Sequence, residues 1–227
     1  MHEESLESKN INNVISIFGK QVGQEELNEF FEGYRKLMAY YRCAMMEVET
    51  KLRVLNEEFS LQHDRNPISS VKTRLKSPDS INGKLRAMGK EVILENIEAL
   101  LHDVAGVRVI CSFEQDVYTL AEALLRQDDV KLIEVKDYIK NPKQNGYRSL
   151  HLIVSVPIFL VNEKKFMKVE IQLRTIAMDS WAELEHQLKY KKNSRFSDEM
   201  AYELYLCSKL SNEFDMRMDA LRDTFDL

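Results

Sequence analysis

Glycine, proline and cysteine are scarce in this sequence, and it has no long apolar run. Seven Gly and four Pro among 227 residues leave little room for linkers between domains. The longest apolar run, residues 150–161, is interrupted by His151, Ser155 and Pro157. It is much shorter than the roughly 20 residues that a membrane-spanning helix needs. We therefore expect a soluble protein with no membrane segment.

The N-terminus and the cysteines both predict a cytoplasmic protein. The first ten residues carry Glu3, Glu4 and Glu7 without an apolar stretch, so they are neither a secretory signal nor a transit peptide. The three cysteines are widely spaced and form no CxxC pair. That pattern fits reduced thiols better than disulfides or a zinc site. The motifs GxxxxGKS/T, GxGxxG and GxSxG are absent too, so any bound phosphate must be held by side chains.

The net charge of −5 is unevenly distributed along the chain. Between Ser69 and Lys90 only one acid, Asp79, accompanies the basic residues Lys72, Arg74, Lys76, Lys84, Arg86 and Lys90. In an arbitrary protein such a segment is a solvated surface. Its position beside the other candidate residues favours a site for an anionic ligand.

The order of the predicted helices and strands suggests an α+β fold rather than a strictly parallel sheet, and we expect a mixed, mostly antiparallel sheet flanked by helices. Apolar residues three or four positions apart predict a long helix from about Glu25 to Phe59. We expect further helices from Pro78, over 92–102 and 114–127, and after Thr175, with strands over 68–75, 105–111, 131–139, 148–159 and 166–174. The chain reads as one domain, with a core over about 65–195 and helical extensions over about 24–60 and 197–226.

The C-terminal extension carries a heptad-like seam. Residues at alternating spacings of four and three form it: Met200, Leu204, Cys207, Ser211, Phe214, Met218, Leu221 and Phe225. Such a stripe needs a partner. It either packs on its own domain or forms a contact between subunits.

Two short segments carry most of the recognisable chemistry. In residues 169–174 the acidic, amide and basic side chains of Glu170, Gln172 and Arg174 alternate with apolar residues, so a strand would present all three on one face. In residues 145–151 a turn precedes the aromatic ring of Tyr147 and the titratable imidazole of His151. Together these groups can stack a base, hold phosphate and bind a metal.

A second carboxylate, Asp103, is expected at the entry to the strand over 105–111. If that strand shares a sheet with Glu170, the two carboxylates converge on a site suited to Mg²⁺. Arg74, Lys76 and Arg108 would supply positive charge for a polyphosphate. The pair His102-Asp103 also suggests a metal-dependent phosphohydrolase, but the other histidines have no recognisable ligand spacing.

These motifs together resemble the RelA/SpoT synthetase domain. The resemblance covers about residues 65–195, through Arg74 to Lys76 with Ser80 and Lys84, and through segments 103–108, 137–151, 170–175, 181–186 and 189–191. It implies a stand-alone small alarmone synthetase with a nucleotidyltransferase-like fold. Members of that family generally assemble as homotetramers through terminal helices. They use ATP to pyrophosphorylate the 3′-hydroxyl of GDP or GTP, which yields ppGpp or pppGpp for stringent-response signalling.

The resemblance also implies a role for each site residue. On the ATP side, Arg74 and Arg108 would sandwich adenine, and Lys76, Ser80 and Lys84 would lie along the phosphates. Asp103 would hold Mg²⁺, while Glu170 would act as the base for the 3′-hydroxyl, bind the metal, or do both. On the acceptor side, Tyr147 would stack on guanine, and the remaining contacts to GDP or GTP would come from Lys143, Asn145, Arg148, His151, Gln172 and Arg174.

Two other classes of function are open at this point. A single-stranded RNA-binding module would use basic residues interleaved with Tyr138 and Tyr147, although Asp103 and Glu170 would repel a phosphate chain. A helical interaction protein would explain the two ends of the chain but not its central motifs. Within the synthetase hypothesis, single-stranded RNA or the product nucleotide are further candidate regulators.

Overall fold

The structure, a computed structural model, describes residues 23–63, 65–190 and 197–224. Its helices are α2 (Gln24–His63), α3 (Pro78–Ala87), α4 (Leu94–Leu100), α5 (Glu114–Leu125), α6 (Ile176–Tyr190) and α7 (Asp198–Thr224). Its strands are β1 (Ile68–Leu75), β2 (Ala105–Cys111), β3 (Lys131–Asp137), β4 (Leu150–Phe159) and β5 (Lys164–Thr175). Two residues of the predicted motifs, Lys191 and Phe225, lie outside the described residues.

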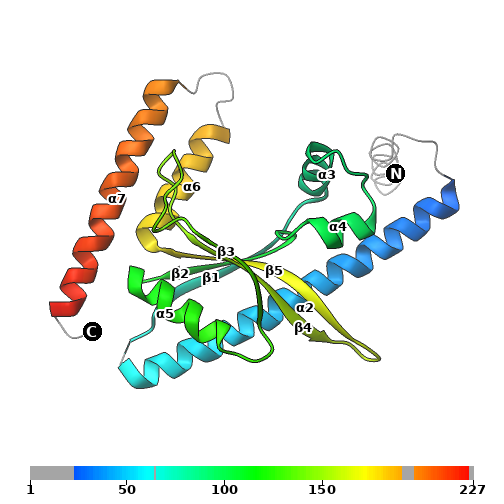
Figure 1. Cartoon of the computed structure of the whole chain (residues 1–227), viewed down its shortest axis with the longest axis horizontal. Helices are drawn as coiled ribbons and strands as arrows, with labels where there is room; N and C mark the ends of the chain where they lie inside the picture. The colour runs from blue at the N-terminus through cyan, green and yellow to red at the C-terminus, as the bar shows by residue number, and fades with distance from the viewer. Residues whose placement is uncertain (1–22, 64, 191–196, 225–227) are drawn as a thin grey trace, which may run out of the picture.

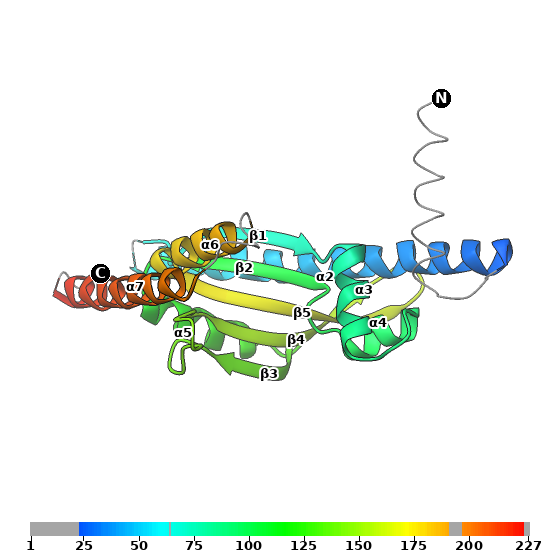
Figure 2. The same cartoon turned by 90° about the horizontal axis from the view of Figure 1, so that it is seen from above.

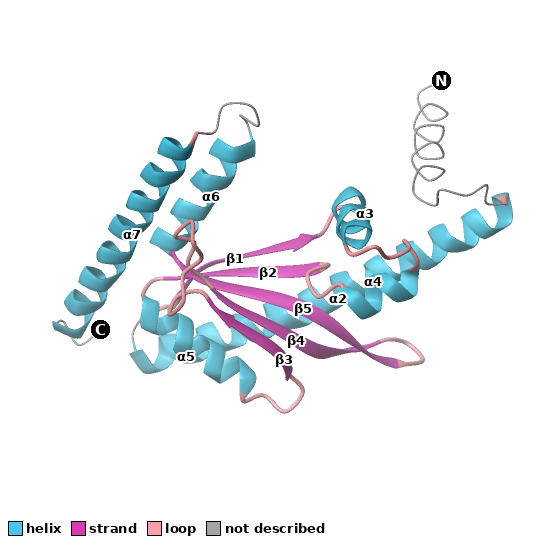
Figure 3. Ribbon diagram, turned by 45° about the horizontal axis from the view of Figure 1, so that its top comes forward, coloured by secondary structure: helices cyan, strands magenta, loops and turns pink. Residues whose placement is uncertain are grey.

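The strands form one sheet in the order β1-β2-β5-β4-β3 (Figures 1 and 3). Strands β2 and β5 run parallel, and the other neighbouring strands are antiparallel. The predicted mixed, mostly antiparallel sheet is thus confirmed. The order also places β2, which carries Arg108, directly beside β5, which carries Glu170.

Helix α2 covers one face of this sheet along most of its width (Figures 1 and 2). Its buried residues recur three or four apart, as the sequence predicts: Leu37, Met38, Tyr41, Ala44, Met45, Val48, Leu52 and Leu55. Helix α5 lies on the same side and adds Val117, Leu120 and Leu124 to the core. Along β5, Val169, Ile171 and Leu173 are fully buried in this core, so alternation turns Glu170 and Gln172 to the other face.

The second face of the sheet is flanked at its two ends by helices (Figure 1). Helices α3 and α4 stand at one end of the strands, and α6 and α7 stand at the other. The face between them holds the polar residues of β1, β2 and β5. No helix in the described ranges is both long and apolar enough to cross a membrane.

Helix α7 buries polar side chains and exposes apolar ones. Its buried residues are Ser208, Asp215 and Arg222. Most of the predicted seam is not packed on the domain, because Met200, Cys207, Phe214 and Leu221 are exposed. The neighbouring apolar residues Leu206, Leu210 and Met216 are exposed as well. The sequence left two possibilities for this stripe, packing on its own domain or contact between subunits. Packing on its own domain covers only a small part of the stripe.

Truncating the buried face of α2 should destabilise the fold. Leu52 is fully buried between α2 and the sheet, so Leu52→Ala should lower the free energy of unfolding by about 2–5 kcal/mol. The matched control is Val54→Ala on the exposed side of the same helix, which should change it by about 0.5 kcal/mol or less. Urea unfolding followed by circular dichroism measures both. Equal effects of the two substitutions would contradict this packing.

Candidate active site

Side chains from all five strands stand in one row across the open face of the sheet. The register pairs Lys72 with Arg108, Arg108 with Gln172, Gln172 with His151, and His151 with Lys136. Directly paired residues on neighbouring strands project to the same face. Residues up to 100 positions apart in the sequence, Lys72 and Gln172, therefore form part of one continuous polar strip.

A cavity lies beside this row, where Gly106 sits between Arg74 on β1 and Glu170 on β5. Because Gly106 has no side chain, the floor between the two larger residues stays open. The cavity has a volume of about 490 Å³, and we call it the sheet cavity. Its lining is Lys72, Thr73, Arg74, Lys76, Asp103, Gly106, Val107, Arg108, Glu170 and Gln172. The structure thus brings both predicted carboxylates and three predicted ATP-binding residues to one place.

Asp103 is held by two lysines from different elements. Its Oδ2 lies 3.0 Å from Lys76 Nζ and 2.9 Å from Lys84 Nζ. Burial acts to raise the pKa of the Asp103 carboxyl, but Lys84 and Lys76 outweigh burial, so this pKa lies below its ordinary value. The other oxygen, Oδ1, is buried and has no hydrogen-bond partner among the described residues. An unsatisfied carboxylate oxygen of a residue that lines a cavity is suited to a cation.

Ser80 lies in the first turn of α3, next to the cap of that helix. Ser77 caps α3 by accepting a hydrogen bond from the Ser80 N–H, and the two hydroxyl oxygens are 2.8 Å apart. The chain enters this helix directly after Lys76. The start of α3 therefore places hydroxyl groups and backbone N–H groups beside the lysines that hold Asp103, a combination that suits phosphate.

Glu170 belongs to a closed ring of hydrogen bonds. One arm runs from Arg174 Nη2 to Tyr147 Oη (2.5 Å), to His151 Nε2 (2.9 Å), and from His151 Nδ1 to Glu170 Oε1 (3.2 Å). The other runs from Arg174 Nη2 to Gln172 Oε1 (3.1 Å), and from Gln172 Nε2 to Glu170 Oε2 (2.9 Å). Five predicted site residues are therefore brought together in one network.

The ring fixes both the proton on His151 and the charge on Glu170. An ionised carboxylate only accepts hydrogen bonds, so His151 must carry its hydrogen on Nδ1, and in the neutral imidazole Nε2 then accepts from Tyr147. Burial acts to raise the pKa of Glu170, but His151 and then Gln172 outweigh burial, and the pKa lies below its ordinary value. Glu170 is therefore ionised at neutral pH and has both oxygens oriented.

The loop between β3 and β4 carries the aromatic part of the site. Lys143 Nζ lies 4.6 Å from the ring centroid of Tyr138 and 4.8 Å from that of Tyr147. Gly146 has a φ of +88°, and a Cβ added there would lie 2.5 Å from Ser208 Cβ. Only glycine therefore fits this turn between Asn145 and Tyr147.

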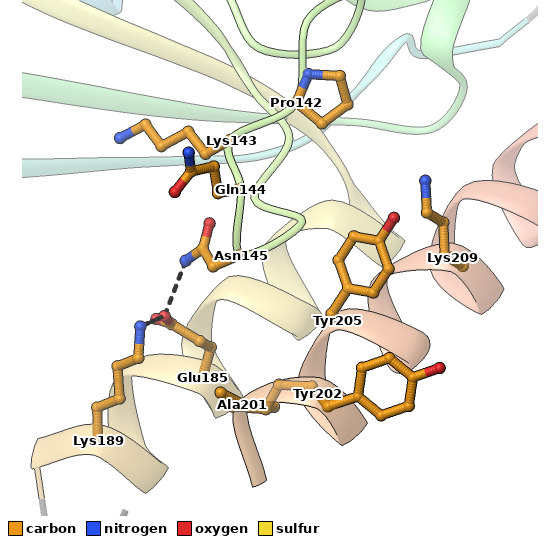
Figure 4. Close-up of a pocket in the computed structure, with 11 residues that line it drawn as sticks. Pro142, Lys143, Gln144, Asn145, Glu185, Lys189, Ala201, Tyr202, Tyr205 and Lys209 are labelled. Atoms are coloured by element: carbon orange, nitrogen blue, oxygen red, sulfur yellow. Dashed lines mark hydrogen bonds and ion pairs between the residues drawn. The ribbon is translucent and has the colours of Figure 1, made fainter. Parts of the chain in front are cut away.

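Asn145 stabilises this loop in the structure. Its Oδ1 accepts a hydrogen bond from the Tyr147 N–H at 3.2 Å, and its Nδ2 donates to Glu185 Oε1 on α6 at 3.0 Å. Figure 4 shows this contact at the edge of a second cavity, about 760 Å³ in volume, between the loop and helices α6 and α7. Tyr202 and Tyr205 of α7 form the opposite side of that cavity.

Arg148 does not line the sheet cavity, and its role in binding the acceptor stays a prediction. Its side chain is only 5% exposed. It pairs with Asp215 of α7 at 2.9 Å and, in a shorter contact, with Glu114 of α5. Because both partners are far away in the sequence, the motif alone makes this arginine look available for a ligand. In the structure, the two ion pairs of Arg148 link the end of the loop to α5 and α7.

Sequence reasoning missed Asp179, which contacts two predicted site residues. It lies in the first turn of α6, and its Oδ1 is 3.1 Å from Arg174 Nη1 and 3.3 Å from Arg108 Nη1. The signal for it was an acidic residue at the start of the helix that directly follows the Glu170 motif. Acidic residues are common in that position for helix stability alone, so the sequence did not distinguish it.

Comparisons with known proteins agree with this geometry. Residues 73–195 match the region found in RelA / SpoT proteins. The chain is 39% identical over 202 residues to the GTP pyrophosphokinase YwaC of Bacillus subtilis (strain 168), covering 89% of this chain and 96% of YwaC. It is 34% identical over 189 residues to the GTP pyrophosphokinase YjbM of the same strain, covering 83% and 88%.

Solved structures give the same result. The structure of small alarmone synthetase 2 from Bacillus subtilis matches with a TM-score of 0.77 and 38% identity, over 84% of this chain and 98% of the other. Small alarmone synthetase 1 from Bacillus subtilis, bound to its product pppGpp, matches with a TM-score of 0.76 and 33% identity, over 84% and 97%.

The hydrogen-bond ring around Glu170 predicts the shape of the pH profile of kcat/KM on its acidic side. His151 is the main group that lowers the pKa of Glu170 against burial, so His151→Ala should raise that pKa. Glu170 would then become protonated at a higher pH, and kcat/KM for pyrophosphate transfer should fall earlier on acidification. The comparison is Tyr147→Phe, which keeps the contact between His151 and Glu170. This variant should shift the pH at which kcat/KM falls by less than His151→Ala does. If kcat/KM fell at the same acidic pH in wild type and His151→Ala, this assignment would be contradicted.

Proposed function

The chain belongs to the RelA/SpoT family of GTP pyrophosphokinases, and we propose that its sheet cavity is where pyrophosphate passes from ATP to the 3′-hydroxyl of GDP or GTP. The products are ppGpp and pppGpp, the alarmones of the stringent response. The observation that carries the assignment of the cavity is its charge pattern. Two carboxylates with lowered pKa values, Asp103 and Glu170, share it with a set of permanent cations.

The ATP side of the cavity is proposed to be the end formed by β1, α3 and the start of β2. Arg74 and Arg108 would stack on adenine, since a guanidinium plane can lie against a base. Lys76, Ser80 and Lys84 would lie along the phosphates. The two lysines pair with Asp103 and offset its negative charge, so this carboxylate would repel a bound polyphosphate less.

We propose that Asp103 is the main protein ligand for Mg²⁺, with Glu170 as a second contact. Asp103 Oδ1 is a buried carboxylate oxygen without a hydrogen-bond partner among the described residues, whereas each Glu170 oxygen accepts one bond. Among the described residues, no group of three or more His, Cys, Asp or Glu gathers as a metal site. Two carboxylates, nucleotide phosphates and water make a suitable set for Mg²⁺, which would neutralise phosphate charge when bound.

Glu170 would act as the general base. It takes the proton of the 3′-hydroxyl onto a carboxylate oxygen, and the hydroxyl oxygen bonds to the β-phosphorus of ATP. The bond from that phosphorus to the α–β bridging oxygen breaks, and AMP leaves. No covalent enzyme intermediate is needed, so the residues work by orientation and charge.

The acceptor nucleotide would lie between Glu170 and the β3–β4 loop. Tyr147 would stack on guanine. The guanine ring would then replace one of the two cations that lie over the Tyr147 ring, Lys143 or Arg174. Lys143 and His151 would then steady the phosphates or ribose, while Gln172 and Arg174 keep Glu170 in place. Asn145 would shape the loop through its contacts with Tyr147 and Glu185.

We propose that residues 1–227 work as one synthetase domain in the cytoplasm, where ATP and guanine nucleotides are available. The comparisons give no support to the alternative of a single-stranded RNA-binding module. A regulatory single-stranded RNA or product nucleotide stays a prediction from the resemblance.

The function can be tested with labelled ATP. Glu170→Gln keeps the size of the side chain but cannot take up a proton, so the rate of label transfer from γ-labelled ATP to GDP or GTP should fall by about 10²–10⁴-fold. Binding of the α,β-methylene analogue of ATP should persist. The control is Glu163→Gln, the same change at an exposed acid outside the cavity, with transfer unchanged. Transfer by Glu170→Gln at the wild-type rate would rule out Glu170 as the base.

The exposed apolar face of α7 supports assembly, which we propose is a homotetramer. Leu210 is 65% exposed and Phe214 is 55% exposed, one turn apart on this helix. A repeated apolar stripe on a helix commonly pairs with a copy of itself.

Replacing both Leu210 and Phe214 by Asp should lower the mass measured by light scattering. The control is Val161→Asp, at an apolar residue that is 98% exposed but lies in the turn after β4. An unchanged mass in the double variant would exclude α7 as the assembly face.

A further inference from the structure

Asp179 is a buried carboxylate that faces three cations from three strands. It is 7% exposed. Its Oδ1 accepts a hydrogen bond from Arg174 Nη1 at 3.1 Å and lies 3.3 Å from Arg108 Nη1. Its Oδ2 lies 3.6 Å from Lys72 Nζ. The three cations come from β5, β2 and β1, in the part of the sheet that lines the cavity.

The chain turn after β5 places Asp179 over the sheet. Thr175 ends β5, and α6 begins at the next residue. The Thr175 Oγ1 accepts a hydrogen bond from the Met178 N–H, in the first turn of α6, at 3.1 Å. Asp179 follows at once, so its side chain returns toward Arg174 on the strand that has just ended. The position is thus fixed by the same segment that carries Glu170.

The contacts of Asp179 join the two sides of the site. Arg108 belongs to the proposed ATP side, and Arg174 starts both arms of the hydrogen-bond ring that ends on Glu170. Guanidinium N–H groups point outward in the plane of the group, so a carboxylate at the edge fixes that plane and leaves the faces for stacking. Without this carboxylate, the neighbouring cations would repel one another.

We propose that Asp179 is a positioning residue for both nucleotides, because it holds Arg108 for the donor and Arg174 for the acceptor and the base. This inference rests on the proposed function. It assigns no contact between Asp179 and a nucleotide. Its effect passes through the two arginines, whose displacement by about 1 Å can change a rate by about 10²-fold.

Glu183 provides a matched comparison on the same helix. It lies one turn after Asp179 and contacts Lys72 at 3.2 Å and Arg108 at 3.6 Å. It has no ion pair with Arg174 among the described contacts and is far more exposed. Glu183→Gln should therefore loosen the ATP side only.

The experiment measures kcat and the two KM values separately for wild type, Asp179→Ala, Asp179→Asn and Glu183→Gln. Asp179→Ala should raise KM for both ATP and GDP and lower kcat/KM by about 10²-fold. Asp179→Asn keeps the shape and one oxygen for Arg174 but loses the charge, so its loss should be smaller. Glu183→Gln should raise KM for ATP and leave KM for GDP unchanged.

Thermal unfolding of each variant separates positioning from simple stability. A lower melting temperature in both Asp179 variants, with kcat and both KM values within twofold of wild type, would overturn the inference. So would a change in KM for ATP alone. If Asp179→Ala does not fold, Asp179→Asn decides between these results. Wild-type transfer is measured first, since its absence would remove the proposed function rather than the role of Asp179.

Discussion

The parallel pairing of β2 with β5 is the constraint on which the whole site depends. It sets Gly106 opposite Glu170, so the base faces a position without a side chain. It also brings Asp103, just before β2, to the same end of the sheet as Glu170. A shift of this register by one residue would turn Glu170 into the core and put buried Ile171 in the cavity. The hydrophobic core against α2 therefore protects the geometry of the active site.

Each acid of the site is held by its own partners. Asp103 has two lysines, Glu170 has an imidazole and an amide, and Asp179 has arginines. These partners keep Asp103 and Glu170 ionised despite burial. The remaining positive charge faces the cavity in a chain of net charge −5. A polyphosphate is thus attracted to one place, and the carboxylates needed for the metal and the proton keep their charge there.

Much of this arrangement could be predicted from the sequence, because alternation and helical spacing are strong signals. They indicated which face of β5 carries Glu170 and that Asp103 stands at the entry to a strand, which would meet Glu170 if the two strands shared a sheet. The burial of Arg148 and its two ion pairs could not be predicted, since Glu114 and Asp215 lie 34 and 67 residues from it. Burial of a charge depends on such distant partners, which no local pattern shows. Asp179 was missed for a different reason, because an acidic residue at the start of a helix is common for helix stability alone.

Helix α7 shows why periodicity alone does not decide which face of a helix packs inward. Its apolar stripe predicts contact, yet its polar side meets the domain, because Asp215 binds Arg148 and Thr175 while Ser208 lies against Gly146. These ion pairs and close contacts leave the apolar side exposed. The helix that supports the loop of Tyr147 therefore also carries the proposed assembly face. A subunit contact on α7 would stabilise this helix, and through Arg148 and Gly146 it would stabilise the conformation of the acceptor loop.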